Sequence, residues 1–361
     1  MRTTDPARAD HPASPGDAGS LDADAVNADA VDADLLIVGA GPVGLFGAYY
    51  AGFRGLSVAV MDALPEPGGQ ISAMYPEKEI LDIAGFPSVR GRDLVTGLLE
   101  QADRFAPTYL LGHQAHTLAG DAATGFTVTS AQGARVRCRA VVVTGGIGAF
   151  TPRPLPAGRE FAGRGVSYFV PRPADHAGHD VVIVGGGDSA FDWAVALHPI
   201  ARSVTLVHRR GTFRAHAHTV AQVRALGIEI ITDAQIAKVI GADRVESVEV
   251  AHAADGTTRT LPADTVVAAL GFTANLGPLR TWGLDVADNR YLAVDTTMST
   301  TVPGVYAAGD ITDYRGKVRL IAVGFGEAAT AVNNAAVLID PDAPLFPGHS
   351  TETAPEAPAA A

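Results

Sequence analysis

The chain has 361 residues, of which 47% are hydrophobic and 18% charged, so it is long enough for two soluble α/β domains. Its net charge of −12 argues against nucleic acid as a partner, although eight Asp and two Arg in residues 1–34 contribute −6 and the tail from Glu352 contributes −2. Cys138 is the single cysteine, which excludes an intramolecular disulfide and a Cys-x-x-Cys redox pair.

Both ends of the chain lack large apolar side chains. Residues 1–33 consist mainly of Ala, Asp, Pro, Gly and Ser, and residues 352–361 are similar, which predicts two disordered tails. No apolar run approaches ~18 residues, and the N-terminus has no hydrophobic core of a signal peptide. We therefore expect a cytoplasmic protein that does not cross a membrane.

Ordered structure is predicted to begin at Asp34 with a strand, a glycine turn and a helix. The strand covers 35–38, the turn 39–44 and the helix 45–52, and a second strand over 57–61 ends at Asp62. This order of elements is that of a nucleotide-binding βαβ unit.

The same order recurs in the middle of the chain. It comprises a strand over 180–184, a turn over 185–190, a helix from 191 and a strand over 203–207 that ends at His208-Arg209-Arg210. The sequence therefore predicts a second βαβ unit. The remaining expected strands cover 135–144, 228–231, 245–250, 264–271 and 302–308, and a final helix covers 325–338.

A glycine turn indicates a dinucleotide site only between a strand and a helix, with a ribose-reading residue about 20 positions later. Gly39 permits the tight turn, Gly41 lets the backbone approach a pyrophosphate, and Gly44 lets the helix pack closely on the strand. The amides at the helix N-terminus then face the phosphate charge. Both units fit this pattern.

The two units differ at the ribose-reading position. Asp62 follows Gly39 by 23 residues, and His208 follows Gly185 by the same number. A carboxylate accepts hydrogen bonds from ribose hydroxyls and repels a 2′-phosphate, whereas Arg209 and Arg210 attract one, with Arg214 nearby. The first unit is therefore expected to bind FAD or NAD, and the second NADP(H).

Gly309-Asp310 follows a predicted strand and precedes a glycine-punctuated helix. Asp310 is placed to accept a hydrogen bond from a flavin ribityl hydroxyl. The helix N-terminus expected within 317–330 would stabilise negative charge on a reduced flavin. These features favour FAD in the first unit.

Together the motifs resemble those of ferredoxin–NADP reductases of the thioredoxin-reductase-like type, over about residues 34–351. The motifs that carry this resemblance are 39–44, Pro67-Gly68-Gly69-Gln70, Tyr75-Pro76-Glu77-Lys78, Ala84-Gly85-Phe86-Pro87, 185–190 with Asp192-Trp193, His208-Arg209-Arg210, Phe213-Arg214-Ala215-His216, Gly309-Asp310, 316–334 and His349-Ser350-Thr351.

The resemblance implies an α/β fold of two Rossmann-like, three-layer ββα domains, with the NADP domain inserted in the FAD domain. The FAD domain would comprise 34–151 and 273–351, including a C-terminal extension that covers the flavin, and the NADP domain 152–272. It also implies a homodimer.

The resemblance further implies two sets of binding residues. FAD would contact Gly39, Gly41, Pro42, Gly44, Asp62, Gly69, Gln70, Tyr75, Ala115, Phe150, Gly309, Asp310, Ser350 and Thr351. NADP(H) would contact Gly185, Gly187, Asp188, Ser189, His208, Arg209, Arg210 and Arg214. Tyr75 and His349 would stack on the two faces of the isoalloxazine, with His349 from its own or the partner subunit. No metal site and no catalytic protein side chain are expected.

The implied activity is that of a ferredoxin–NADP(+) reductase, which passes a hydride from NADPH to flavin N5 and then single electrons to ferredoxin or flavodoxin. A disulfide reductase of the same architecture needs a redox-active cysteine pair, so that alternative stays open only for an external disulfide or thiol substrate. A flavin- or NADP-binding sensor without turnover is the other alternative.

Overall fold

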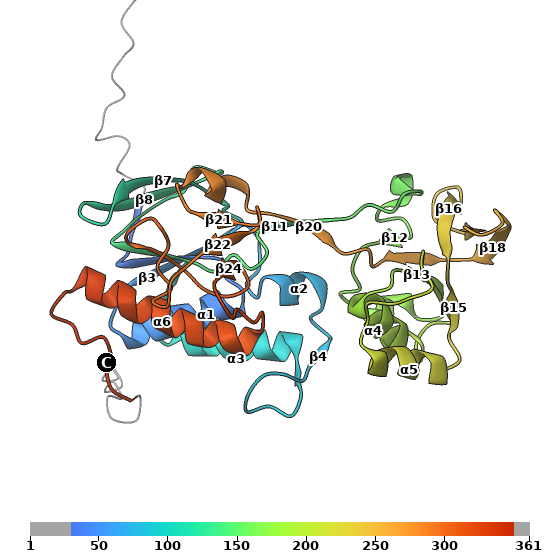
Figure 1. Ribbon diagram of the computed structural model, residues 1–361, viewed down its shortest axis with the longest axis horizontal. Coiled ribbons are helices and arrows are strands. Elements are labelled where there is room, and N and C mark those ends of the chain that lie inside the picture. Colours follow the sequence, from blue (N-terminus) through green and yellow to red (C-terminus); the bar gives the residue numbers. More distant parts are fainter. Residues whose placement is uncertain (1–29, 350–361) are drawn as a thin grey trace, which may run out of the picture.

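The computed structural model describes residues 30–349, except for the side chains of residues 149–151 and 273–274. Two parallel five-stranded sheets form the centres of two domains, which lie at opposite ends of the molecule (Figure 1). β11 (Ala149–Pro152) carries the chain out of the first domain and β20 (Phe272–Asn275) carries it back. The two strands pair antiparallel, so the second domain is an insertion in the first.

The first domain is built on the parallel sheet β23-β10-β2-β3-β6. Helices α1 and α6 pack on one face of this sheet, and a four-stranded sheet with the order β1-β9-β8-β7 covers the other. The bounds are β1 (Ala30–Asp32), β2 (Leu35–Val38), α1 (Pro42–Phe53), β3 (Val58–Asp62), α3 (Gly91–Asp103), β6 (Thr108–Leu111), β7 (Ala115–Asp121), β8 (Gly125–Ser130), β9 (Arg135–Cys138), β10 (Ala140–Val143), β23 (Val305–Ala307) and α6 (Ile321–Ile339).

The central strands are apolar throughout because both of their faces are buried. In β2, Leu35 and Ile37 pack toward the helices, while Leu36 and Val38 pack toward the four-stranded sheet. Successive side chains of a strand point to opposite faces, so a sheet covered on both sides needs continuous rather than alternating apolar residues. This is the three-layer ββα arrangement expected from the resemblance.

The second domain repeats this plan with the sheet order β12-β19-β13-β14-β15. Phe191 and Trp193 of α4 lie over one face, and a three-stranded antiparallel sheet lies over the other. The bounds are β12 (Val166–Ser167), β13 (Asp180–Val184), α4 (Asp188–Leu197), β14 (Ser203–Val207), α5 (Ala217–Ala225), β15 (Glu229–Ile231), β16 (Ala234–Ile240), β17 (Ser247–His252), β18 (Thr258–Pro262) and β19 (Thr265–Ala268).

Short elements complete both domains. They are α2 (Gln70–Met74), β4 (Glu79–Ile80), β5 (Val89–Arg90), β21 (Val286–Ala287), β22 (Tyr291–Ala293), β24 (Thr312–Asp313) and the 3-10 helices Arg159–Phe161, Pro173–His176 and Gly277–Thr281.

The strand expected over 135–144 is wrong, because this segment forms two strands in different sheets. β9 belongs to the four-stranded sheet and β10 to the central parallel sheet. The amides of Arg139 and Ala140 both donate to the carbonyl of Asp34, which marks the point where the chain changes sheets. A continuous apolar pattern does not show such a change.

Two expected starting points also shift. A strand already occupies residues 30–32, before the predicted start at Asp34, because β1 adds to the edge of β9 and Asp32 pairs with the Arg137 guanidinium at 2.7 Å; the rest of the predicted N-terminal tail, residues 1–29, lies outside the described residues. Helix α6 begins at Ile321 rather than 325, because its N-cap residue Leu320 is still extended.

Helix α6 is long and apolar enough to cross a membrane by length and composition. This stretch was not predicted from the sequence as a candidate span. In the fold, Ala331, Val332 and Ala335 of this helix pack into the core beside the central sheet. Packing against the sheet accounts for the buried part of this helix, which is 39% of its most apolar stretch.

Among residues 30–349, the Tyr75 side chain and an ion pair make contacts between the two domains. Tyr75 packs against apolar clusters of both domains. Lys78, three residues later, donates to the carboxylate of Asp192 on α4 at 2.5 Å. The segment after α2 is thus a contact point between the domains.

Candidate functional site

A cavity of roughly 360 Å³ opens at the carboxyl ends of β2, β3, β10 and β23. Ligands of open α/β sheets bind outside the carboxyl ends of the strands, and this volume lies within the ~300–1,000 Å³ typical of ligand pockets. Its lining includes ten residues predicted for FAD, namely Gly39, Gly41, Pro42, Asp62, Gly69, Gln70, Tyr75, Ala115, Gly309 and Asp310.

The glycine turn between β2 and α1 is closed on one side and open on the other. Gly39 has φ +118°, and a Cβ there would lie 2.7 Å from the carbonyl oxygen of Thr144. A Cβ on Gly41 would have no heavy atom within 4 Å, so this glycine faces the open cavity. The turn and the N-terminus of the 12-residue helix α1 thus form a cradle that fits a pyrophosphate.

Gly44 does not line the cavity but holds the turn in shape. A Cβ at Gly44 would lie 1.8 Å from the carbonyl oxygen of Gly39 and 2.7 Å from Oγ1 of Thr144. That hydroxyl donates to the Gly39 carbonyl at 2.8 Å. The first turn of α1, the loop and the end of β10 therefore meet at one crowded point.

Asp62 ends β3 with its carboxylate beside the glycine turn. It accepts hydrogen bonds from the amides of Ala40 at 2.6 Å and Leu64 at 2.7 Å. Burial raises the pKa of Asp62, and these two hydrogen bonds oppose the rise. The carboxylate is thus fixed in orientation, and ribose hydroxyls that donate to it would compensate its lost hydration.

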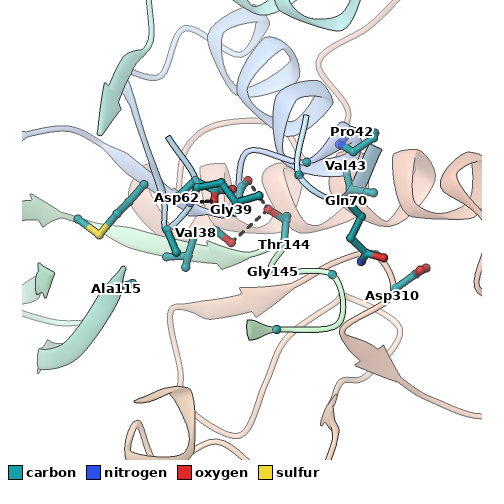
Figure 2. A pocket seen from close by; sticks show the side chains of 18 of the residues that line it. Val38, Gly39, Pro42, Val43, Asp62, Gln70, Ala115, Thr144, Gly145 and Asp310 are labelled. Carbon is teal, nitrogen blue, oxygen red and sulfur yellow. Dashed lines mark hydrogen bonds between the residues drawn. The ribbon is translucent and has the colours of Figure 1, made fainter. Parts of the chain in front are cut away.

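The other end of the cavity is polar and aromatic. Gln70 and Asp310 lie there, away from Asp62 and Ala115 (Figure 2). Burial raises the pKa of Asp310, while the nearby Lys317 and Arg319 oppose the rise. Burial, followed by the charge of Asp310, raises the pKa of Tyr75 to about 12. Ile321, the first residue of α6, also lines the cavity and lies in one apolar cluster with Tyr75, so the N-terminus of α6 lies at the cavity wall.

The second glycine turn lies at the end of β13, where Gly185 and Gly186 are buried and the residues around the turn are exposed. Arg209, Arg210 and Arg214 are exposed around it, as are Asp188 and Ser189 at the start of α4. The Arg214 amide donates to the Gly186 carbonyl at 2.8 Å, which folds the arginine-bearing loop back onto the turn. This arrangement suits a phosphate-bearing nucleotide.

His208 lies in this turn with its ring against Gly186. A Cβ at Gly186 would lie 2.2 Å from His208 Cε1, and Nε2 donates to the Thr212 carbonyl at 3.2 Å. Burial lowers the pKa of His208, and Arg209 and Arg210 lower it further. The arginines rather than His208 therefore supply positive charge here.

Several predicted residues lie elsewhere. Phe150 is on the linking strand β11, and its side chain is outside the described part of the structure, as are Ser350 and Thr351 altogether. His349 is exposed, packs on Phe346 with ring centroids 5.2 Å apart, and does not line the cavity. Within residues 30–349, no group of three or more His, Cys, Asp or Glu side chains is arranged to hold a metal.

Part of the cavity lining was not predicted from the sequence. The missed residues are mainly Val38, Val43, Met61, Thr144, Gly145, Gly146, Gly148, Leu276, Pro278, Leu279 and Ile321. Thr144-Gly145-Gly146 carried a usable signal, because it ends a buried parallel strand. No signal in the sequence marks Leu276, Pro278 and Leu279 as lining residues. They reach the cavity only because the chain returns to the first domain after the inserted domain.

Comparisons with known proteins agree with this geometry. Residues 33–335 match the pyridine nucleotide-disulphide oxidoreductase family model. Proteins named ferredoxin–NADP reductase from Frankia casuarinae and Salinispora tropica are 62% and 63% identical over 88% of this chain and 98% of their own length. The protein of that name from Thermus thermophilus is 48% identical over 89% of this chain and 97% of its own.

The chain belongs to the ferredoxin–NADP reductases of the pyridine nucleotide-disulphide oxidoreductase family. Its predicted family, its two-domain Rossmann-like fold and its use of FAD and NADP(H) are thereby confirmed.

Solved structures support the fold. The thioredoxin reductase of T. acidophilum superposes with a TM-score of 0.73 at 26% identity, covering 84% of this chain and 98% of its own. The thioredoxin reductase of Lactococcus lactis gives a TM-score of 0.71 at 23% identity, covering 85% and 99%. The chain thus shares its fold with thioredoxin reductases.

Replacing Gly44 by Ala should weaken FAD binding by about tenfold or more, because overpacking at such a contact costs about 1–3 kcal/mol. The measurement is the FAD content of the purified protein and its FAD dissociation constant. Gly97→Ala is the control, since a Cβ there would meet no atom within 4 Å. Equal FAD binding by both variants would contradict the role assigned to Gly44.

Replacing Arg209 and Arg210 together by Ala should raise KM for NADPH by about ten- to a hundredfold, as expected for lost charge-assisted hydrogen bonds. KM for NADH should change little. Steady-state diaphorase kinetics with both coenzymes measures this. Arg224→Ala, at an exposed arginine of the same domain, is the control, and an equal loss for NADPH and NADH would refute the assignment.

Proposed function

We propose that this protein transfers electrons between NADPH and ferredoxin, with FAD in the cavity at Asp62 and NADP(H) on the arginine-lined turn. The difference between the two glycine turns is the observation that carries this proposal: one presents a carboxylate and the other two exposed arginines. The name shared by relatives 62–63% identical over 98% of their length supports ferredoxin as the partner.

The proposed role of the protein is to bind and orient its two cofactors. When bound, FAD supplies the ability to accept two electrons from NADPH and to release them one at a time. Gly41 and the α1 amides would hold its pyrophosphate, Asp62 its ribose, and Asp310 its ribityl chain. Tyr75 lines the cavity near Asp310, at the end where the isoalloxazine ring would bind, and it would pack on the flavin and exclude water.

Cys138 argues against thiol chemistry by this chain. It is buried beneath the central sheet, and burial raises the pKa of its thiol to about 12. The thiolate is the reactive form of cysteine, so this side chain stays inert near neutral pH. A disulfide or thiol substrate would therefore need to meet the flavin directly.

We further infer that His349 covers the flavin of a partner subunit in a homodimer. The Arg54 guanidinium donates to the carbonyls of Pro344 and Leu345 at 2.9 and 3.2 Å, which ties this segment to the C-terminal end of α1. In this conformation His349 does not line the cavity of its own chain.

Exposed apolar side chains support a dimer. Leu345 and Phe346 are 55% and 62% exposed on the C-terminal segment. Leu81 and Leu320 are exposed beside Ile80 and Ile321, which pack in one cluster near the ring end of the cavity. A partner subunit would bury both sets. A cytoplasmic location and the use of flavodoxin belong to the same proposal.

The proposed activity is tested by cytochrome c reduction through ferredoxin. The purified protein should contain FAD and reduce cytochrome c with NADPH only when ferredoxin is added, with NADH a poor substitute. Flavodoxin in place of ferredoxin tests the second acceptor. NADPH oxidation with ferricyanide but no transfer through any ferredoxin would overturn the ferredoxin assignment and keep the flavoenzyme, while cofactor binding without turnover would favour a sensor.

Deleting residues 349–361 should alter the visible absorption of the bound flavin and its reactivity with external acceptors, because one face of the ring would lose its cover. The matched control deletes only 352–361 and keeps His349. Identical spectra and kinetics for the two truncated proteins would remove His349 from the flavin site.

A further inference from the structure

A buried ion pair lies next to the cavity without lining it. Lys317 Nζ is 2.5 and 2.7 Å from the carboxylate oxygens of Glu327, and the two side chains are only 2% and 5% exposed. When two charges are buried, the free energy lost by removing them from water is often as large as the free energy gained from their attraction. Fold stability alone is thus a weak explanation of this pair.

In the described part of the chain, the three hydrogen-bonding partners of the Glu327 carboxylate all belong to the loop segment 309–317 before α6, which includes the short strand β24. Besides Lys317, its carboxylate accepts from the amide of Gly309 at 2.7 Å and from the hydroxyl of Tyr314 at 2.5 Å. This loop carries Asp310 into the cavity. Helix α6, which holds Glu327, therefore clamps both ends of the loop segment that contains Asp310.

The opposite side of the same loop is held by α1. Gly309 has φ +84°, and a Cβ there would lie 3.2 Å from Val43 in the first turn of α1. The backbone before Asp310 is thus confined between α1 and the Glu327 carboxylate. A shift of that carboxylate would move Asp310 relative to the cavity.

We propose that Glu327 and Lys317 are positioning residues for the flavin site, which hold the Gly309-Asp310 backbone in the geometry that binds the ribityl chain. Neither side chain lines the cavity, so they act through Asp310. The proposal rests on the proposed function only in assigning the cavity to FAD.

Two double variants separate positioning from stability. Lys317→Met with Glu327→Leu removes both charges and the acceptor of the Gly309 amide, and apolar replacement of a whole buried pair tends not to destabilise a protein. Lys317→Met with Glu327→Gln removes the charges but keeps an oxygen acceptor. Asp313→Asn, which breaks the more exposed Arg319–Asp313 pair of the same loop, is the control.

The measurements are the melting temperature of each FAD-free protein, the FAD dissociation constant and the fluorescence of bound flavin. Both double variants should fold, but the Leu variant, whose buried Gly309 amide has lost its acceptor, should melt below the Gln variant. The Leu variant should also bind FAD about tenfold more weakly than the wild type, the loss expected for a hydrogen bond to a charged group. Its flavin fluorescence should change as well. The Gln variant should regain most of the affinity, and the control should match wild type.

Equal FAD affinity and fluorescence in the Leu variant and wild type would overturn the inference. If the Leu variant does not fold, hydrogen exchange of the segment 309–317 in the wild type decides: greater protection with FAD bound supports the proposal, and unchanged protection overturns it. A wild-type protein that binds no FAD would contradict the proposed function instead.

Discussion

The FAD half of the molecule depends on the close approach of three backbone segments at Gly39, Gly44 and Thr144. An ordinary side chain at Gly44 would overlap the Gly39 carbonyl, so absence of a Cβ sets how near α1 comes to β2. That distance places the helix N-terminus at the cavity, and the end of β3 brings Asp62 to the same edge. Because Gly44 has no Cβ, α1 packs closely enough on the turn after β2 to form the cofactor cradle.

Features encoded within about 25 consecutive residues were predictable from the sequence. The strand–turn–helix order, Asp62 and the arginines after β14 belong to such local units, and the strands over 35–38, 180–184 and 203–207 have the predicted bounds. Leu276 and Leu279 were not predictable, because they reach the cavity only after the insertion of a whole domain. The change of sheet at Arg139 was also hidden, since β9 and β10 share one apolar pattern.

Helix α6 shows why a lone charge in an apolar helix is hard to interpret from sequence. Its composition alone is compatible with a membrane span, and its single carboxylate looks like an interruption. In the fold, Glu327 faces a loop that lies outside the helix and precedes it in sequence. The partners of such a buried charge become visible only when the tertiary structure brings loop and helix together.

The paired strands β11 and β20 limit how the two domains can move. Their register runs from Ala149 opposite Asn275 to Pro152 opposite Phe272, so the two connections form one ribbon rather than two independent tethers. A hydrogen-bonded ribbon bends and twists far more easily than it stretches. Lys78 and Asp192 form a second point of attachment, but this ion pair is partly exposed and contributes at most about 1 kcal/mol. A rotation of the inserted domain about the ribbon would therefore cost little more than this one pair.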